Sequence, residues 1–125
     1  MSKDNTDEFV TLLSAQLDEY SSEVQEIVNN EVEDLVEEGK RKIKELSPVG
    51  SRTKNKYKNG WRTNIVKSFS GIEAQIGNKQ FQLTHLLEHG HLTVNKTSRT
   101  KAIPHVGPTQ KWVGEELERR LKSKL

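Results

Sequence analysis

The chain has 125 residues, which suits one domain, and 30% of them are charged. It has no cysteine, which excludes disulfides and Cys-based zinc sites. No stretch approaches the ~20 apolar residues of a membrane-spanning helix, and no apolar run of a signal peptide follows the first residues. We therefore expect residues 1–125 to form a single domain with no membrane association.

The charges are distributed unevenly along the chain. Residues 1–38 hold twelve acids and one base, whereas residues 39–125 hold six acids and nineteen bases, so the two parts carry net charges of −11 and +13. Such polarity suits electrostatic registration against neighbouring subunits or nucleic acid. It equally suits an acidic helix that packs beside the basic remainder of its own chain. The sequence leaves both interpretations open.

Residues 6–46 are predicted to form one long helix. Apolar residues recur mostly at spacings of three and four from Leu13 to Leu46, and Thr6 or Asp7 could cap the start. At 1.5 Å per residue this helix would be roughly 60 Å long, more than a small domain can cover.

The long helix has a defined end and one weak point. Ser47-Pro48 ends it, because the residue before a proline is pushed out of the helical region. Gly39 is where the helix would break if it is divided in two. We expect residues 1–47 to be an acidic helix that can project from a basic α+β body of residues 48–125.

The basic body alternates turn-forming segments with short regular elements. Its predicted parts are a basic loop at 48–60, a hairpin of Trp61–Phe69 and Ile72–Ile76 around Ser70-Gly71, a short helix at Gln82–His89, a loop at 91–102 and a helix at Pro108–Lys122. A third strand is the alternative for Gln82–His89, but its leucine spacing favours the helix. The predicted fold class is α+β, with a long N-terminal helix, a small antiparallel sheet, a short helix and a C-terminal helix.

His85-Leu86-Leu87-Glu88-His89 matches the H-x-x-E-H pattern of zinc peptidases. Histidines four residues apart share a helix face and can bind one metal, while the glutamate activates water. His91 and His105 could add ligands. Gly90 ends the helix immediately, however, and no later acid is placed to complete an active site. We therefore expect no catalytic residue, no metal and no cofactor, with a small metal-dependent hydrolase as the second alternative.

A basic stretch is interleaved with two aromatic residues. The bases are Arg52, Lys54, Lys56, Lys58 and Arg62, and the aromatic residues are Tyr57 and Trp61. Basic side chains that neutralise phosphates, next to aromatic rings that stack on nucleobases, are typical of proteins that bind single-stranded nucleic acid. No recognition helix or stacking motif accompanies them, so direct nucleic-acid binding is the first alternative and is not expected.

Several segments follow one another in a recognisable order. They are Ser47-Pro48-Val49, Tyr57-Lys58-Asn59-Gly60-Trp61, Ile76-Gly77-Asn78, Leu87-Glu88-His89-Gly90 and Pro104-His105-Val106-Gly107-Pro108. In this order the chain resembles a family of small neck or tail-completion proteins of tailed bacteriophages, over roughly residues 20–125. Many members carry a Pro-x-x-Thr-Gly turn after the long helix, where this chain has Pro48-Val49-Gly50-Ser51-Arg52-Thr53.

The resemblance implies a virion structural protein without catalysis, a head–tail connector subunit in a ring around the axis through which DNA passes. The partners it implies are other copies and the neck, head-closure and tail proteins. It places the protein in the virion, and in the host cytoplasm during assembly. It also implies that certain motif residues shape the fold: Gly77, Glu88, His89, Gly90, Pro104, His105 and Pro108.

A candidate subunit interface combines the apolar stripe and the two charge signs. It comprises Leu17 and Val24, the acids Glu31, Glu33, Asp34, Glu37 and Glu38, and the bases Lys96, Arg99 and Lys101. We expect the loop at 91–102 to be mobile in the free protein and to become ordered against the acidic helix of the next subunit.

Overall fold

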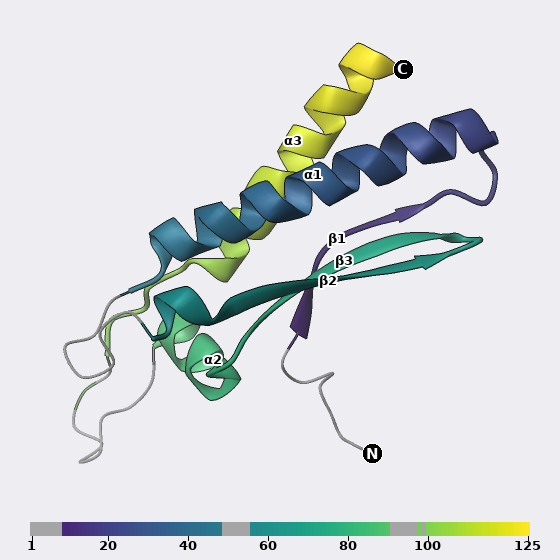
Figure 1. Ribbon diagram of the computed structural model, residues 1–125. Helices are drawn as coiled ribbons and strands as arrows, with labels where there is room; N and C mark the ends of the chain where they lie inside the picture. The colour runs from purple at the N-terminus through teal and green to yellow at the C-terminus, as the bar shows by residue number, and fades with distance from the viewer. Residues whose placement is uncertain (1–8, 49–55, 91–97, 99) are drawn as a thin grey trace, which may run out of the picture.

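The computed structural model describes residues 9–48, 56–90, 98 and 100–125. In chain order the elements are β1 (Phe9–Gln16), α1 (Ser22–Leu46), the 3-10 helix η2 (Lys58–Gly60), β2 (Trp61–Ser68), β3 (Gly71–Asn78), α2 (Phe81–His89) and α3 (Val106–Lys124). The strands form an antiparallel sheet in the order β1-β3-β2. Helices α1 and α3 lie along one face of this sheet, and α2 lies at the end where β3 finishes (Figure 1). The predicted α+β class is confirmed.

The prediction of one helix over residues 6–46 is wrong for its first part. Phe9–Gln16 is a strand that pairs with β3, from Phe9 opposite Gly77 to Gln16 opposite Gly71. The register shifts between Thr11 and Leu13, and Leu12 is the extra residue of this bulge. The bulge places apolar side chains at consecutive positions, which hides the period-2 alternation of a strand.

The N-cap of helix α1 lies 14 residues after Asp7 and 15 after Thr6, the two predicted caps. Ser21 is its N-cap, since the Ser21 side chain accepts a hydrogen bond from the backbone N–H of Val24 at 3.2 Å. Glu23 lies in the first turn, where the helix dipole favours an acid. Thr6 and Asp7 lie outside the described residues. The helix ends at Leu46 with Ser47 as its C-cap, as predicted.

Gly39 does not break α1, which is continuous over 25 residues. A Cβ atom at this position would lie 3.0 Å from Cγ1 of Val113 and 3.1 Å from Cδ2 of Leu12. The missing side chain therefore allows α1 to approach both α3 and β1 closely.

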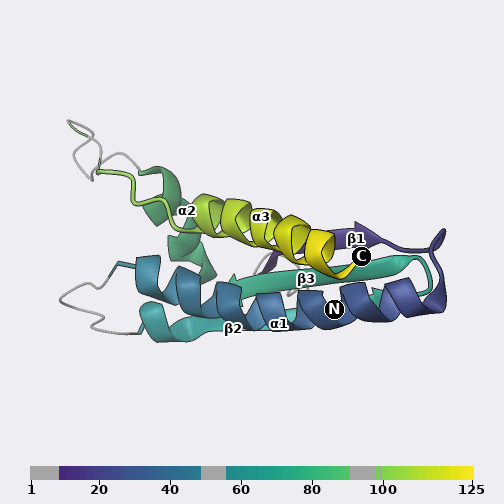
Figure 2. The same ribbon diagram turned by 90° about the horizontal axis from the view of Figure 1, so that it is seen from above.

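The core lies between the sheet and the two long helices. Seen from above, α1 runs over the β2 side of the sheet and α3 over the β1 side (Figure 2). The buried apolar residues include Val28, Val32, Leu35, Val36 and Ile43 of α1, Ile72, Ala74 and Ile76 of β3, and Val113 and Leu117 of α3. The apolar stripe of α1 is thus covered along most of its length by the chain's own sheet and by α3.

The predicted hairpin and the two predicted helices of the body are confirmed with small shifts at their ends, while most of each predicted loop, at 48–60 and at 91–102, lies outside the described residues. The hairpin turns between Ser68 and Gly71, and α2 is a helix stopped by Gly90, whose φ of 74° lies in the left-handed region. Helix α3 starts at Val106, two residues before the predicted Pro108, which lies in its first turn.

Strand β2 is an edge of the sheet with a regular register. Its eight residues pair with β3 without interruption, from Trp61 opposite Asn78 to Ser68 opposite Gly71. The other edge, β1, is modified by its bulge and by Gln110 of α3, whose amide donates to the carbonyl of Thr11 at 2.9 Å. The two edges of the sheet are therefore not equivalent.

Candidate interaction surfaces

The carboxylate of Glu88 holds the first turn of α3. It accepts hydrogen bonds from the backbone N–H groups of His105 and Val106 at 2.8 Å and of Gly107 at 2.9 Å. Burial alone would raise the pKa of Glu88, but the three backbone donors together outweigh it, so the pKa is lowered. Glu88 is therefore an anionic cap on a helix that begins 18 residues later in the chain.

His105 is fully buried next to this cap. Its Nδ1 lies 2.7 Å from the carbonyl oxygen of Ile103 and 3.0 Å from Oε1 of Glu88. Because both neighbours of Nδ1 are acceptors, Nδ1 carries a proton. Its Nε2 lies 2.7 Å from the hydroxyl of Tyr57. The His105 side chain thus joins the segment before α3 to the segment before β2.

Two buried aromatic rings complete this cluster. The rings of Tyr57, Trp61 and His105 meet edge to face, with centroids 5.4 to 5.8 Å apart. Burial raises the pKa of Tyr57 to about 12. The indole N–H of Trp61 donates a hydrogen bond to the hydroxyl of Ser47 at 2.7 Å. This hydroxyl in turn donates to the carbonyl oxygen of Ile43 at 2.6 Å. The end of α1 is thereby fastened to the start of β2.

The residues that match the zinc-peptidase pattern have different surroundings from those of a metal site. His85 and His89 are exposed, while Glu88 between them is engaged by α3. No group of three or more His, Asp or Glu side chains that could hold a metal ion occurs among the described residues, and His91 lies outside them.

The aromatic residues that suggested nucleic-acid binding face the interior. Tyr57 is 2% exposed and Trp61 is 5% exposed, so neither ring is available to stack on a base. Of the accompanying bases, Arg52 and Lys54 lie outside the described residues, and Arg62 lies over the ring of Phe9.

Three acids of the candidate interface pair with bases of the same chain. Glu38 accepts two hydrogen bonds from the guanidinium of Arg120 at 2.8 and 2.9 Å, and this pairing lowers the pKa of Glu38. Glu31 pairs with Lys124, and Glu33 pairs with Lys67. Part of the charge asymmetry is thus compensated within the chain. This agrees with the interpretation in which the acidic helix packs beside the basic remainder of its own chain.

The other candidate interface residues have varied surroundings. Asp34 and Glu37 are exposed on the outer face of α1, and Lys101 is exposed before α3. Leu17 is 4% exposed and belongs to the core, while Val24 is partly buried against it. Lys96 and Arg99 lie outside the described residues.

An apolar groove opens at the end of the molecule where β1 finishes and α1 begins. Its volume is about 200 Å³, and its walls come from the end of β1, the first turns of α1 and the last turns of α3. The residues that line it are Ala15, Gln16, Leu17, Tyr20, Val24, Val28, Leu121 and Leu125. Tyr20 and Leu125 are 57% and 64% exposed. The nearby turn between β2 and β3 carries Phe69, which is 89% exposed.

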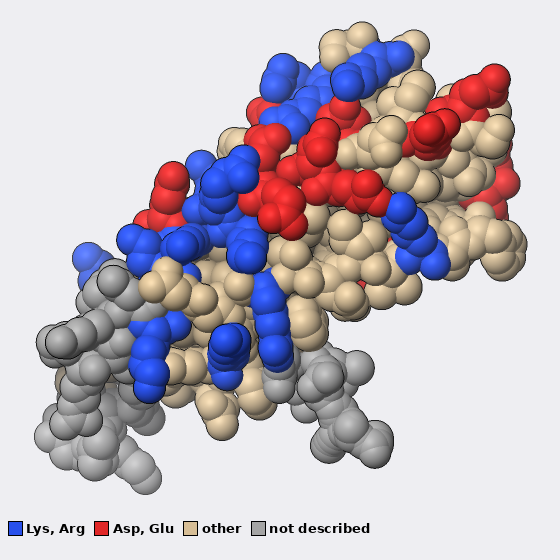
Figure 3. Space-filling model, viewed as in Figure 1, with Lys and Arg blue, Asp and Glu red and all other residues tan. Residues whose placement is uncertain are grey.

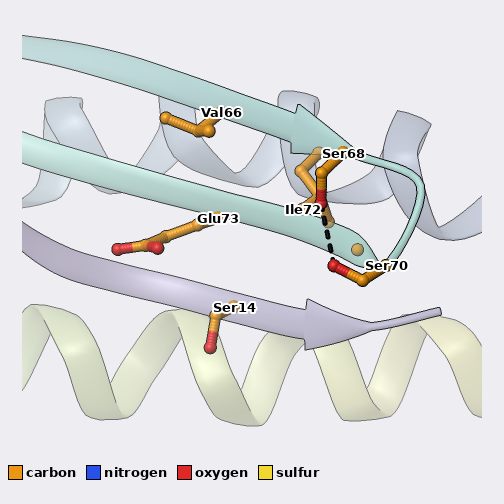
Figure 4. A pocket seen from close by; sticks show the side chains of 7 residues that line it. Ser14, Val66, Ser68, Ser70, Ile72 and Glu73 are labelled. Carbon is orange, nitrogen blue, oxygen red and sulfur yellow. Dashed lines mark hydrogen bonds between the residues drawn. The ribbon is translucent and has the colours of Figure 1, made fainter. Parts of the chain in front are cut away.

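A shallow polar hollow lies beside the same turn, where β1, β2 and β3 carry Ser14, Val66, Ser68 and Glu73 (Figure 4). The hydroxyls of Ser68 and Ser70 are 2.9 Å apart at its rim. Glu73 accepts a hydrogen bond from Thr11 at 2.6 Å and from Gln75 at 3.3 Å. Its carboxylate is thus part of a hydrogen-bonded ladder across the strands.

Comparison with known families identifies the chain. The model of the family described as "Bacteriophage HK97-gp10, putative tail-component" matches residues 13–90, which is more than half of the sequence. The chain belongs to this family. Searches of curated proteins and of solved structures found no match.

Membership in the HK97-gp10-like family confirms the resemblance to phage neck and tail-completion proteins. It gives the chain a structural role as a component of the phage particle, among other particle proteins. Among the described residues, no helix has the length and apolar character to cross a membrane.

The matched region of this HK97-gp10-like chain runs from β1 to the end of α2 and stops at Gly90. Helix α3 lies beyond it but is bound to it through Glu88 and Arg120. The resemblance implied that Glu88 and His105 shape the fold, but it did not relate them to Tyr57 and Trp61, which contact His105, or to Ser47, which binds Trp61. A buried polar cluster of this kind leaves no periodic signal in the sequence.

Proposed function

We propose that this protein is a non-catalytic subunit of the head–tail junction of a tailed phage. In this proposal it forms a ring with other copies and contacts neck, head-closure and tail proteins. Family membership supplies the phage particle as its setting.

The observation that carries the non-catalytic role is the engagement of Glu88. The side chain best placed to act as an acid or base accepts three backbone hydrogen bonds and stabilises the start of α3. Its neighbour His105 is buried between Tyr57 and Ile103. These groups stabilise the fold, and a structural subunit needs no more from them.

The contacts of the described residues favour neither nucleic-acid binding nor metal-dependent hydrolysis. A single-strand binder requires exposed aromatic rings, whereas Tyr57 and Trp61 are buried. A metal-dependent hydrolase requires a free general base beside its ligands, whereas Glu88 is engaged.

Deletion of the gene from the phage tests the proposal. We expect normal synthesis of phage DNA, together with heads and tails that do not yield infectious particles. Supply of the wild-type chain from a plasmid should restore the infectious yield, and so should the variant His85→Ala, since His85 is exposed. A normal yield from the deletion phage, or a yield that depends on His85, would contradict the proposal.

A further inference from the structure

The two ends of the molecule differ in the sign of their unpaired charges. The end where α1 begins carries Asp18, Glu19, Glu23 and Glu26, none of which has an ion-pair partner among the described residues. The bases nearest to this end, on α3, are already paired with acids of the chain. The groove end therefore has an excess of negative charge.

The opposite end, where α1 finishes and η2 and β2 begin, is basic. It carries Lys44, Lys56, Lys58 and Lys79, and Lys79 is placed there by its backbone hydrogen bond to Gly60 at 3.1 Å. None of these lysines has an ion-pair partner among the described residues. Figure 3 shows Lys and Arg over the end of α1 and the start of β2, with a second group along α3, and Asp and Glu over the beginning and middle of α1.

Exposed apolar side chains gather at the same two ends. Seven large apolar residues are exposed among the described residues, and three of them, Tyr20, Phe69 and Leu125, are at or near the acidic groove. Three others, Leu46, Leu86 and Ile103, lie at the basic end. Ile103 is held beside α2 by its backbone hydrogen bond to the carbonyl of Leu87 at 2.7 Å. The seventh, Val66, lies on the sheet.

The size of the groove indicates the kind of occupant it can take. About 200 Å³ is less than the roughly 300–1,000 Å³ of pockets that bind small molecules. It can accept one or two apolar side chains from a protein surface. The acids at its end favour a surface that also carries bases.

We infer that the groove end of one copy receives the basic end of a second copy. Apolar residues such as Leu46 or Leu86 then pack against the groove and against Phe69, while lysines approach the acids of the first copy. The two surfaces differ, so the contact is heterologous and closes into a ring when the rotation permits. This inference rests on the proposed function, because it assigns the surfaces through which copies of the subunit meet.

Engineered cysteines test the contact directly, because the chain has none of its own. One variant carries Glu23→Cys and Lys44→Cys together, at the two ends of α1. These positions are about 32 Å apart along the helix, beyond the reach both of a disulfide and of a short cross-linker. A short flexible thiol cross-linker added to concentrated protein and to purified particles can therefore join them only between copies.

We expect a ladder of dimers, trimers and higher oligomers from the double-cysteine variant. A mixture of the two single-cysteine variants should stop at dimers. High salt should weaken the ladder in concentrated protein, because it screens exposed charges. The matched control pairs Glu23→Cys with Asn64→Cys on the exposed sheet, and it should give no ladder.

Three results would overturn the inference. The first is the absence of cross-linked copies both in concentrated protein and in particles. The second is a dimer from Glu23→Cys alone, which would mean a symmetric contact. The third is cross-linking of both ends only to other particle proteins. In each case a deletion phage that still lacks infectious yield would leave the proposed function intact. A deletion phage with normal yield would instead contradict the proposed function, whatever the cross-linking pattern.

Discussion

The Glu88 carboxylate lies 3.0 Å from the ring Nδ1 of His105 and also accepts the backbone N–H of His105 at 2.8 Å. One side chain of α2 thus fixes both the orientation of a buried ring and the start of α3. Since α3 covers the β1 side of the sheet, a change at Glu88 affects packing well beyond its own contacts.

Glu88→Gln should lower the free energy of unfolding by about 1–2 kcal/mol, because an amide keeps the shape but loses the charge that favours a helix N-terminus. Glu115→Gln on the exposed face of α3 is the matched control and should change stability little. Urea unfolding at neutral pH measures both. Equal stability of Glu88→Gln and the wild-type protein would show that the cap contributes nothing.

The same contact predicts a dependence on pH. The pKa of Glu88 is lowered in the folded state, so its contribution is complete above the ordinary value of 4.5 and is lost as the pH falls through the lowered value. The difference in stability between wild type and Glu88→Gln should therefore be largest at neutral pH and should shrink in acid. Unfolding curves at several pH values test this, and a difference that grows in acid would contradict it.

Ser47→Ala should destabilise the fold by about 1–3 kcal/mol, because it leaves the buried indole N–H of Trp61 without an acceptor. Trp61→Phe removes that donor. The double variant should then be more stable than the sum of the two single effects predicts, with a coupling of about 1 kcal/mol. Additive effects in this double-mutant cycle would mean that the hydrogen bond is unimportant.

Two glycines on the long helices should respond in opposite directions. Gly39→Leu should destabilise by about 1–3 kcal/mol through overpacking, because Val113 and Leu12 already lie within 3.0 and 3.1 Å of a Cβ at this position. Gly114→Ala meets nothing within 4 Å and should stabilise α3 by about 0.5–1 kcal/mol. Thermal unfolding of both variants measures the contrast. Stabilisation by both would show that α1 and α3 can separate at no cost.

Phe69→Ser should leave the stability of the monomer within about 0.5 kcal/mol, since the ring is 89% exposed, but should weaken association between copies. Leu17→Asp should unfold the monomer, because Leu17 is 4% exposed in the core. Circular dichroism and sedimentation of each variant separate folding from association. Unimpaired association of Phe69→Ser would remove this ring from the contact between copies.

The elements that the sequence predicts well are those with an undisturbed local pattern. The hairpin around Ser70-Gly71 and the leucine spacing of α2 are local signals, and both elements are found where they were expected. The sequence of strand β1 predicts a helix because the bulge at Leu12 interrupts the alternation of a strand, and because helical apolar spacings continue into α1. Ser21, which caps α1, was the local signal that could have separated the two elements.

The candidate sites depend on contacts between residues that are distant in the sequence. Glu88 and Val106 are 18 positions apart, and Tyr57 and His105 are 48 apart, so no local spacing relates them. The resemblance to phage proteins marked some of these residues as shaping the fold, but only the packed chain shows which atoms they bind. The sequence pattern predicts Phe69 as the end of a strand, whereas Phe69 lies at the exposed turn.

The uninterrupted edge of β2 has a consequence for the supply of this protein during infection. Trp61–Ser68 contains no proline and no bulge, and among the described residues no strand pairs with its outer side, so another extended chain can add to this edge in a free copy. Unassembled copies that accumulate can therefore aggregate through this edge. The yield of particles would then depend on matching the synthesis of this protein to the rate at which growing particles take it up.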